Sequence, residues 1–318
     1  MSGDLHTEAQ GLYTEALCCQ VLGNYHECIF LVRRASALVE LCGLSHGALD
    51  HALVNCQAEV HALKSEYGHA CKLYRQLLQT YQEGQLYHEA LSLINIAQVE
   101  IPMGVSYNTI QRKIYASQSI FTQIGSKTMT TACDVTQADL NLREGDMSCF
   151  LFRKCLKFGW KQFSEVVSYC LERLADITSW GTHHDPSWSI VLLAHSLKTK
   201  EKLGIHKALQ YLGDVHLMEN DEVTAISLFT VASEGFTNMD VHRSRAECMV
   251  RLGDLAKKNG DLLKALALWE TARPLFERSS QAKRLPGIDE RVGGISEEMK
   301  AQRRKTLACV MSRVAGAG

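Results

Sequence analysis

The hydrophobic positions of this chain follow a helical period over most of its length. Alanine and leucine recur at spacings of three and four residues, and a glycine or asparagine interrupts the pattern about every twenty residues. The chain contains only 4 prolines, the residue type that most strongly disfavours helix interiors. This pattern predicts helices of moderate length that are joined by tight turns and pack as pairs.

One helical pair is present in two copies. The Leu-Gly-Asp tripeptide at 212–214 recurs at 252–254, which is an offset of 40 residues. The same offset matches Asp221 with Asp261, Ala225 with Ala265, Leu228 with Leu268, Phe229 with Trp269 and Ala232 with Ala272. The two segments are therefore copies of one repeat unit.

The spacing within this unit resembles that of a tetratricopeptide (TPR) repeat. The resemblance rests on Leu209, Leu212, Gly213, Ala225, Phe229 and Ala232 in one copy, and on Met249, Leu252, Gly253, Ala265, Trp269 and Ala272 in the other. The usual aromatic residue of the first helix is replaced by His216 or Ala256, and the closing proline is missing. Because the period exceeds the usual length of about 34 residues, we expect helices longer than the standard ones.

A small residue on the first helix explains this spacing, because Gly213 or Gly253 lets the second helix approach closely. Extending the small site upstream identifies Ala175, Ala138, Ala97, Ala58 and Ala16, at successive distances of 38, 37, 41, 39 and 42 residues. Turn residues follow several of these sites, at Gly23-Asn24, Gly104, Gly145-Asp146, Asn220-Asp221 and Gly260-Asp261. Seven helical pairs account for most of the chain.

The predicted fold class is therefore all-α. We expect a right-handed α-solenoid of about seven TPR-like hairpins with a period of about 40 residues, covering residues 4–279. Residues 280–318 are expected to form a C-terminal linker and a capping helix, with the helix itself over 295–314.

The whole array also resembles the TPR region found in mushroom-forming fungi, often at the C-terminal end of STAND-class NTPases. The stretches that carry this resemblance are 64–67 (KSEY), 138–147 (ADLNLREGDM), 170–176 (CLERLAD) and 267–283 (ALWETARPLFERSSQAK). The resemblance implies a sensor or partner-binding arm that an ATPase would normally precede, present here without that ATPase.

Composition narrows the classes of partner and the compartment. Lys and Arg total 34 against 35 for Asp and Glu, so no excess of charge steers the protein toward nucleic acid or an anionic membrane. The N-terminus lacks the pattern of a secretory leader, and no apolar run approaches the length of about 20 residues that spans a bilayer. We therefore expect a cytoplasmic protein whose 12 cysteines are reduced and mostly buried, with Cys18 and Cys19 packed in the core.

No motif predicts catalysis, a cofactor or a metal. Residues 125–128 (Gly-Ser-Lys-Thr) lack the spacing of a phosphate-binding loop and are expected to be a turn between helices. His183, His184 and Asp185 have no further ligand at a useful spacing, so a solvated loop is expected there. The chain is therefore not expected to be an enzyme.

One row of polar residues remains as a candidate site. The residue after each small site is Leu17, Glu59, Gln98, Asp139, Asp176, Asp214 or Asp254. In TPR arrays this position faces the concave groove, and stacking places equivalent residues side by side. Such a ladder could accept hydrogen bonds from a peptide backbone or pair with its Lys and Arg side chains. Helical phase adds Glu172, Lys207, Gln210 and Glu247 as groove-facing candidates.

The competing interpretation is that this ladder pairs with itself. Arg173 and Arg251 lie three residues before Asp176 and Asp254, which is a spacing at which helical ion pairs form. The leading hypothesis is a non-catalytic protein-interaction scaffold whose concave groove binds a peptide or partner segment of basic or donor-rich character. The alternative is homotypic assembly, or a regulatory or sensor arm of a STAND-type signalling system.

Overall fold

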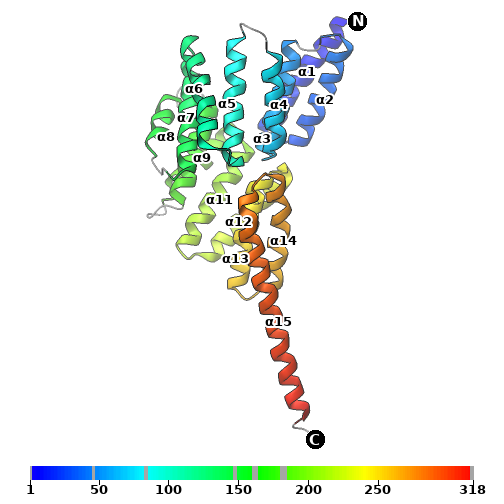
Figure 1. The fold of residues 1–318 in the computed structure, drawn as a ribbon, viewed down its shortest axis with the longest axis vertical. Coiled ribbons are helices and arrows are strands. Elements are labelled where there is room, and N and C mark those ends of the chain that lie inside the picture. Colours follow the sequence, from blue (N-terminus) through cyan, green and yellow to red (C-terminus); the bar gives the residue numbers. More distant parts are fainter. Residues whose placement is uncertain are drawn as a thin grey trace.

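The computed structural model describes residues 2–44, 47–81, 85–145, 149–159, 164–179 and 185–315. Within these residues the chain forms fifteen α-helices and one short 3-10 helix, and no strand. The helices follow one another as seven antiparallel pairs and a terminal helix, as the sequence predicts (Figure 1). None of the described helices is long and apolar enough to cross a membrane.

We call the first helix of each pair its A helix and the second its B helix. The A helices are α1 (Ser2–Val21), α3 (Ala48–Leu63), α5 (Leu86–Met103), α7 (Lys127–Arg143), α9 (Ser164–Ser179), α11 (Lys202–Met218) and α13 (His242–Lys258). The B helices are α2 (Tyr25–Leu41), α4 (Tyr67–Thr80), α6 (Tyr107–Gln123), α8 (Phe150–Gly159), α10 (Ser187–Thr199), α12 (Glu222–Met239) and α14 (Leu262–Arg278). A 3-10 turn, η1 (Ala282–Arg284), leads into α15 (Leu285–Ala315).

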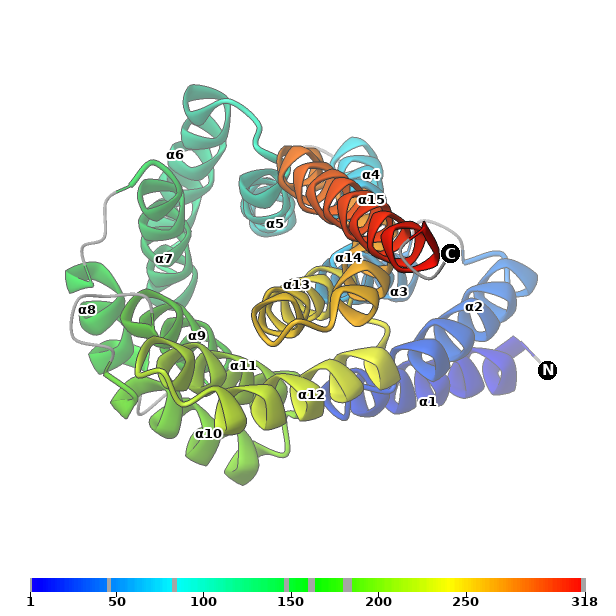
Figure 2. The same ribbon diagram turned by 90° about the horizontal axis from the view of Figure 1, so that it is seen from below.

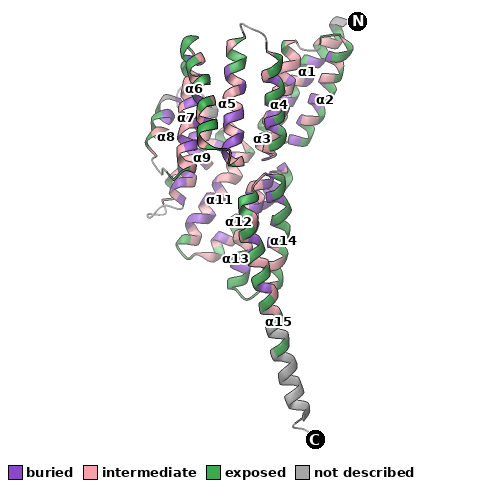
Figure 3. Cartoon of the chain, viewed as in Figure 1, coloured by how far each residue is buried: buried purple, intermediate pink, exposed green. Residues whose placement is uncertain are grey.

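The small sites lie where the packing argument places them. All seven are buried in A helices: Ala16, Ala58, Ala97, Ala138, Ala175, Gly213 and Gly253. At Gly213 an added Cβ would lie 2.7 Å from a ring carbon of Phe229, and at Gly253 it would overlap the indole of Trp269. The two glycines are therefore matched to large aromatic residues on the B helices. Buried residues recur along the helices of the array (Figure 3).

The predicted turns are confirmed where the structure describes them, whereas Asp146, like His183 and His184, lies outside the described residues. Gly23 and Gly104 adopt positive φ angles of 71° and 75° after α1 and α5, a conformation that glycine adopts without a steric penalty. Asp221 and Asp261 cap α12 and α14, because each side chain accepts a hydrogen bond from a backbone N–H three residues later.

Two expectations need correction. Helix α15 begins at Leu285 and not near 295, because Ile288 and Ile295 are spaced to pack together into the apolar cluster around Trp269. Cys18 is exposed, because it lies on the face of α1 opposite to the buried Ala16. Most other described cysteines, such as Cys28 and Cys56, are buried as free thiols.

The array curves so that the A helices form its concave face. Contacts join α1 to α3, α5 to α7, α7 to α9 and α9 to α11, whereas contacts between successive B helices are weaker than any of these in the described part of the chain. The helices that approach each other lie on the inside of the curve. Figure 2 shows the pairs following one another around an arc, with α13 and α14 near its centre.

The superhelix returns onto itself after the sixth pair. The backbone N–H of His242, at the start of α13, donates to the carbonyl of Lys64, at the end of α3, over 3.1 Å. The side chain of Gln281 donates to the carbonyl of Pro102 over 2.7 Å, and Met239 packs against Gly23. The turns of the first three pairs therefore rest on the last two pairs, which lie below them in Figure 1.

Candidate partner-binding surface on the concave face

The predicted ladder is a chain of contacts between successive A helices. From pair two onward, every predicted ladder position contacts another side chain: four reach a neighbouring A helix, Asp176 meets an arginine of its own helix, and Asp254 meets Arg291 on α15. The ladder changes its chemistry along the array. We call the part on α1, α3 and α5 the amide ladder and the part on α7, α9, α11 and α13 the charged ladder.

The amide ladder uses mainly uncharged groups. Gln20 donates to the carboxylate of Glu59 over 3.1 Å, and Gln98 donates to the hydroxyl of Thr136 on α7 over 3.2 Å. Between them, Asn95 lies 3.5 Å from Asn55. These contacts join residues 38 to 40 positions apart, which is about one repeat.

The charged ladder begins at Asp139 on α7. Its carboxylate accepts a hydrogen bond from the hydroxyl of Tyr169 over 2.6 Å and lies 3.5 Å from the Nε atom of Arg173. On α9, Glu172 lies 3.4 Å from the ammonium of Lys207 on α11. Burial acts to raise the pKa of Glu172, but Lys207 and Arg173 outweigh it and leave that pKa below its usual value.

Glu247 on α13 continues the charged ladder. It accepts hydrogen bonds from Gln210 on α11 over 3.1 Å and from Arg243 on its own helix over 3.0 Å. Burial acts to raise the pKa of Glu247, but the charges of Arg243 and Arg251 outweigh it and hold that pKa well below its usual range. Glu247 is therefore an ionised group that the protein itself neutralises.

Two aspartates form two-point pairs with arginines that lie two helices further along the chain. Asp214 is fully buried and accepts from both Nε and a terminal nitrogen of Arg251. Asp254, whose side chain is 44% exposed, accepts from Arg291 on α15 over 2.8 and 3.1 Å. Burial raises the pKa of Asp214 to about 7, although Arg251 acts to lower it. Each pair fits the fork of the guanidinium to the carboxylate.

The sequence predicts that Arg173 and Arg251 each pair with the aspartate three residues later on the same helix. Of these two pairs, the structure records the one at Arg173. Arg173 lies 3.6 Å from Asp176 on the same helix, as predicted. Arg251 forms its two-point pair with Asp214 of the preceding A helix, and Asp254 pairs with Arg291. An offset of 37 residues separates the members of both pairs. That shared offset is the signal by which the sequence could have identified Arg291.

Asp176 differs from the other members of the charged ladder. Its side chain is 35% exposed, and its one recorded ion-pair partner, Arg173, also contacts Asp139 and Glu172. Burial raises the pKa of Asp176 more than Arg173 lowers it, and the negative charge of Glu247 adds to the rise. Asp176 is thus a carboxylate whose one recorded ion-pair partner is shared with two other acids.

The structure therefore gathers seven of the ten predicted site residues into one cluster. Those seven are Asp139, Glu172, Asp176, Lys207, Gln210, Asp214 and Glu247. Glu59 and Gln98 belong to the amide ladder, and Asp254 lies at the contact with α15. Tyr169, Tyr211 and Arg243 complete the cluster through contacts with Asp139, Glu172 and Glu247. They lie outside the row that follows the small sites, so the repeat pattern does not point to them. Whether these residues bind a partner stays a prediction.

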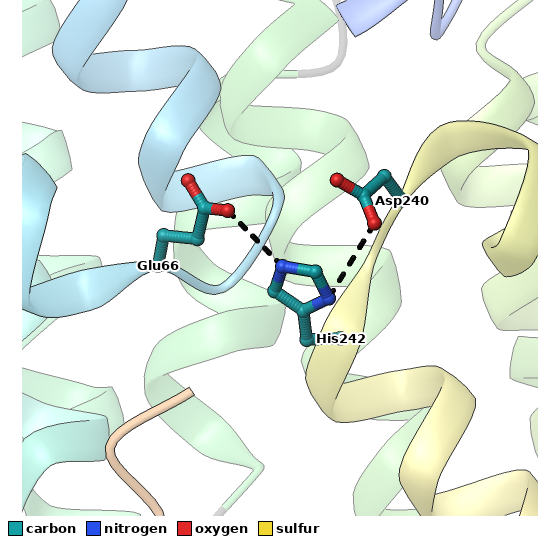
Figure 4. A group of neighbouring side chains, drawn as sticks. All are labelled: Glu66, Asp240 and His242. Atoms are coloured by element: carbon teal, nitrogen blue, oxygen red, sulfur yellow. Dashed lines mark hydrogen bonds and ion pairs between the residues drawn. The ribbon is translucent and has the colours of Figure 1, made fainter. Parts of the chain in front are cut away.

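A second polar cluster lies where the superhelix meets itself (Figure 4). We call Lys64, Glu66, Asp240 and His242 the coil clasp. The imidazole of His242 lies between two carboxylates, with Nε2 3.1 Å from Glu66 and Nδ1 3.6 Å from Asp240. Residues 66 and 242 are 176 positions apart, so no local pattern in the sequence indicates the clasp.

The coil clasp neutralises its own carboxylates. The ammonium of Lys64 lies 3.3 Å from Glu66 and 2.8 Å from Asp240, so a cation of the protein already bridges them. The two nitrogens of His242 face different carboxylates, and one metal ion cannot bind both nitrogens of a single ring. Although Glu66, Asp240 and His242 lie close together, their arrangement fits an ion-pair network and not a metal site.

Comparisons with known proteins show the fold. No protein-family model matches the chain, and no curated protein sequence matches it significantly. Among solved structures, a Rap protein complexed with Competence and Sporulation Factor is similar over 89% of this chain and 87% of that chain, with a TM-score of 0.56 and 11% sequence identity. The similarity supports a TPR-like helical repeat architecture for this chain.

Proposed function

We propose that the protein is a non-catalytic interaction scaffold that binds a peptide or a partner segment along its concave face. The observation that carries this proposal is the continuous polar ladder on the A helices, which orders hydrogen-bonding side chains along one curved surface. The solved structure with the same fold is itself that of a complex with a bound factor. In this proposal residues 4–279 are the interaction array, and 280–318 are a linker and cap.

The ladder is suited to recognition because its side chains are already held in place. A side chain that is ordered before binding loses less conformational entropy when a partner arrives. Glu172 and Arg243 are each fixed by an ion pair and yet keep part of their side-chain surface exposed. Fully buried Asp214 has no exposed surface, so its role in this proposal is to position Arg251.

The direct test is selection from a displayed library of random heptapeptides on the immobilised full-length protein. We expect enriched sequences that bind in solution, measured by isothermal titration calorimetry. A variant carrying both Glu172→Gln and Arg243→Gln should bind the same synthetic peptides at least tenfold more weakly, because it loses charge-assisted hydrogen bonds. The matched control is Asp289→Asn, which alters an exposed ion pair between Asp289 on α15 and Arg273 on α14 and leaves Glu172 and Arg243 unchanged.

Binding by the variants is compared only after a control for folding. Circular dichroism must show equal helicity in all variants. Enriched peptides that bind the wild type and the control but not the double variant support the concave face as the binding site. Failure to enrich any sequence above an unrelated helical protein, or equal binding by the double variant, would contradict the proposal.

Homotypic assembly is a second candidate function, in which the array acts as the regulatory arm of a STAND-type system. The supporting observation is that large apolar side chains are exposed on B helices, at the convex side: Phe30, Leu41, Phe150, Ile190, Leu197, Val223, Val231 and Leu263. Size-exclusion chromatography with light scattering tests it. A monomer at all concentrations up to about a millimolar would exclude stable self-association in that range.

A further inference from the structure

The charged ladder contains more carboxylates than cations. Apart from the pair of Asp254 with Arg291 at its end, its described acidic members are Asp139, Glu172, Asp176, Asp214 and Glu247, and its basic members are Arg173, Lys207, Arg243 and Arg251. Five carboxyl groups therefore face four cationic groups on adjoining surfaces of α7, α9, α11 and α13. A desolvated cluster of this kind is most stable when its charges balance.

Asp176 has the longest recorded ion pair of the five carboxyl groups and no recorded side-chain hydrogen bond among the described residues. Each of the other four carboxylates has a hydrogen bond or ion pair with a group that serves it closely, such as Tyr169 for Asp139 at 2.6 Å. Among the described residues, the one ion-pair partner recorded for Asp176 is Arg173, whose terminal nitrogen lies 3.6 Å away, and Lys207 and Arg243 act on Asp176 without a recorded contact. The guanidinium of Arg173 lies 3.5 Å from Asp139 and 3.3 Å from Glu172, so its one charge is shared among three acids.

A second group in this cluster also lacks a donor. The amide nitrogen of Gln210 donates to Glu247, which fixes the orientation of the amide and leaves its oxygen Oε1 as an acceptor. That oxygen has no hydrogen-bond partner among the described residues, although Gln210 is 99% buried, with only 1% of its surface exposed. A buried acceptor without a donor is costly, and native structures rarely leave one.

The two groups lie in one region of the concave face. Glu172 on α9 lies 3.4 Å from Lys207 on α11. Asp176 and Gln210 follow these two residues by four and three positions, so they lie about one turn further along the same contact between the two helices. Asp176 is the partly exposed member and Gln210 the buried one. A group that enters beside Asp176 and carries several N–H donors would satisfy both.

We propose that Asp176 on α9 and the Oε1 atom of Gln210 on α11 form a subsite for one cationic N–H group of the bound partner. The group is the ammonium of a lysine or of a free N-terminus, or the guanidinium of an arginine. Its single positive charge balances the fifth carboxylate, and its donors serve both acceptors. The subsite rests on the proposed function, because it assigns one anchor within the same concave surface.

A metal ion fits the subsite less well than an organic cation. Calcium and magnesium require several oxygen ligands converging on one point. The other four carboxyl groups of the cluster are already held by cations or hydrogen-bond donors of the protein at shorter distances. The subsite offers one carboxylate and one amide oxygen, which suits a multi-donor nitrogen group.

The test uses a heptapeptide synthesised from the sequences enriched by library selection. Three forms are titrated by calorimetry: the parent peptide, a form in which its basic residue is norleucine, and a form whose N-terminus is acetylated. We expect one of the two changes to weaken binding to the wild type at least tenfold, and that change identifies the side chain or the terminus as the source of the cation. Asp176→Asn should weaken the parent peptide by a similar factor.

Coupling between protein and peptide is the decisive result. The peptide change that matters for the wild type should cost less than about twofold with Asp176→Asn, because the charge it addresses is gone. Asp289→Asn should behave like the wild type. Binding that is equally strong for all three peptide forms, or unaffected by Asp176→Asn, overturns the subsite while the proposed function stands. If no peptide is enriched at all, the proposed function fails and the subsite with it. The peptide-side comparison uses wild-type protein only, so equal binding of all three peptide forms overturns the subsite even if Asp176→Asn proves unstable.

Discussion

The amide ladder and the charged ladder occupy equivalent positions of the same repeat and differ in what they place there. Gln98 reaches Thr136 on the next A helix, and Asp214 reaches Arg251 on the next A helix, with offsets of 38 and 37 residues. Both ladders therefore use the same kind of contact between neighbouring A helices. The difference teaches that one structural position can carry either a modest contact between neutral groups or a desolvated ion pair whose loss leaves a buried charge.

The largest difference in stability loss is expected when one partner is removed from the charged ladder and one from the amide ladder. Arg251→Met leaves fully buried Asp214 without its arginine, so we expect a loss of about 3 kcal/mol in the free energy of unfolding. Gln98→Ala removes one neutral hydrogen bond and should cost about 1 kcal/mol. Urea denaturation followed by circular dichroism measures both. Equal losses would show that the chemical difference between the ladders has no energetic consequence.

Substitutions at the small sites of the A helices should give the next largest loss of stability. Gly213→Ala places a Cβ 2.7 Å from the ring of Phe229, and this overpacking should cost about 2 kcal/mol. The reverse change in an earlier pair, Ala97→Gly, should cost about 1 kcal/mol, because it adds backbone freedom within a helix. Thermal unfolding compares the two. A neutral Gly213→Ala would mean that Phe229 can move aside.

The coil clasp should respond to Glu66→Gln with a loss of about 2 kcal/mol, because charge-assisted hydrogen bonds from His61 and His242 are weakened. We expect the radius of gyration from small-angle X-ray scattering to increase as the turns of the first and last pairs separate. His26→Ala is the control, because that imidazole is 74% exposed at the edge of the clasp and should matter little. An unchanged radius and stability in Glu66→Gln would contradict a clasp that holds the coils together.

The clasp also predicts a direction for pH dependence. Burial acts to raise the pKa of Glu66, but hydrogen bonds from His242 and His61 and the charge of Lys64 outweigh it and hold that pKa well below its usual range. The folded state therefore favours the ionised form. Its contribution to stability is complete above the ordinary glutamate pKa of about 4.3 and is lost as the pH falls below it. The stability difference between wild type and Glu66→Gln should accordingly shrink in acid, and a difference that grows in acid would contradict this origin.

The smallest effect is expected at the end of the charged ladder. Asp254 has the same two-point geometry as Asp214 but is 44% exposed, so Asp254→Asn should cost less than about 1 kcal/mol. The loss should shrink further in high salt, which screens exposed charges. A cost as large as that of Arg251→Met would show that geometry, and not burial, sets the strength of these pairs.

The fold was largely predictable because its signals are local. The spacing of Leu212, Gly213 and Phe229 within one hairpin reflects contacts between helices that adjoin in sequence, and the same holds for the caps at Asp221 and Asp261. The candidate surface was predictable in its position, since ladder residues follow the small sites. Its pairing was less predictable, because Asp176 and Asp214 look alike in the sequence while their surroundings differ.

By itself the sequence determined the helices, the seven pairs and the face on which the polar ladder lies, because each depends on spacings within about one repeat. Only the tertiary structure decided which ladder charges are neutralised by the next helix, which carboxylate is left over, and that Glu66 meets His242 across 176 residues. The physical reason is that the position of each repeat depends on all the repeats before it. Small rotations between neighbouring pairs add up to the superhelical turn that brings distant turns together, and burial, which sets the energy of each charge, depends on that whole path.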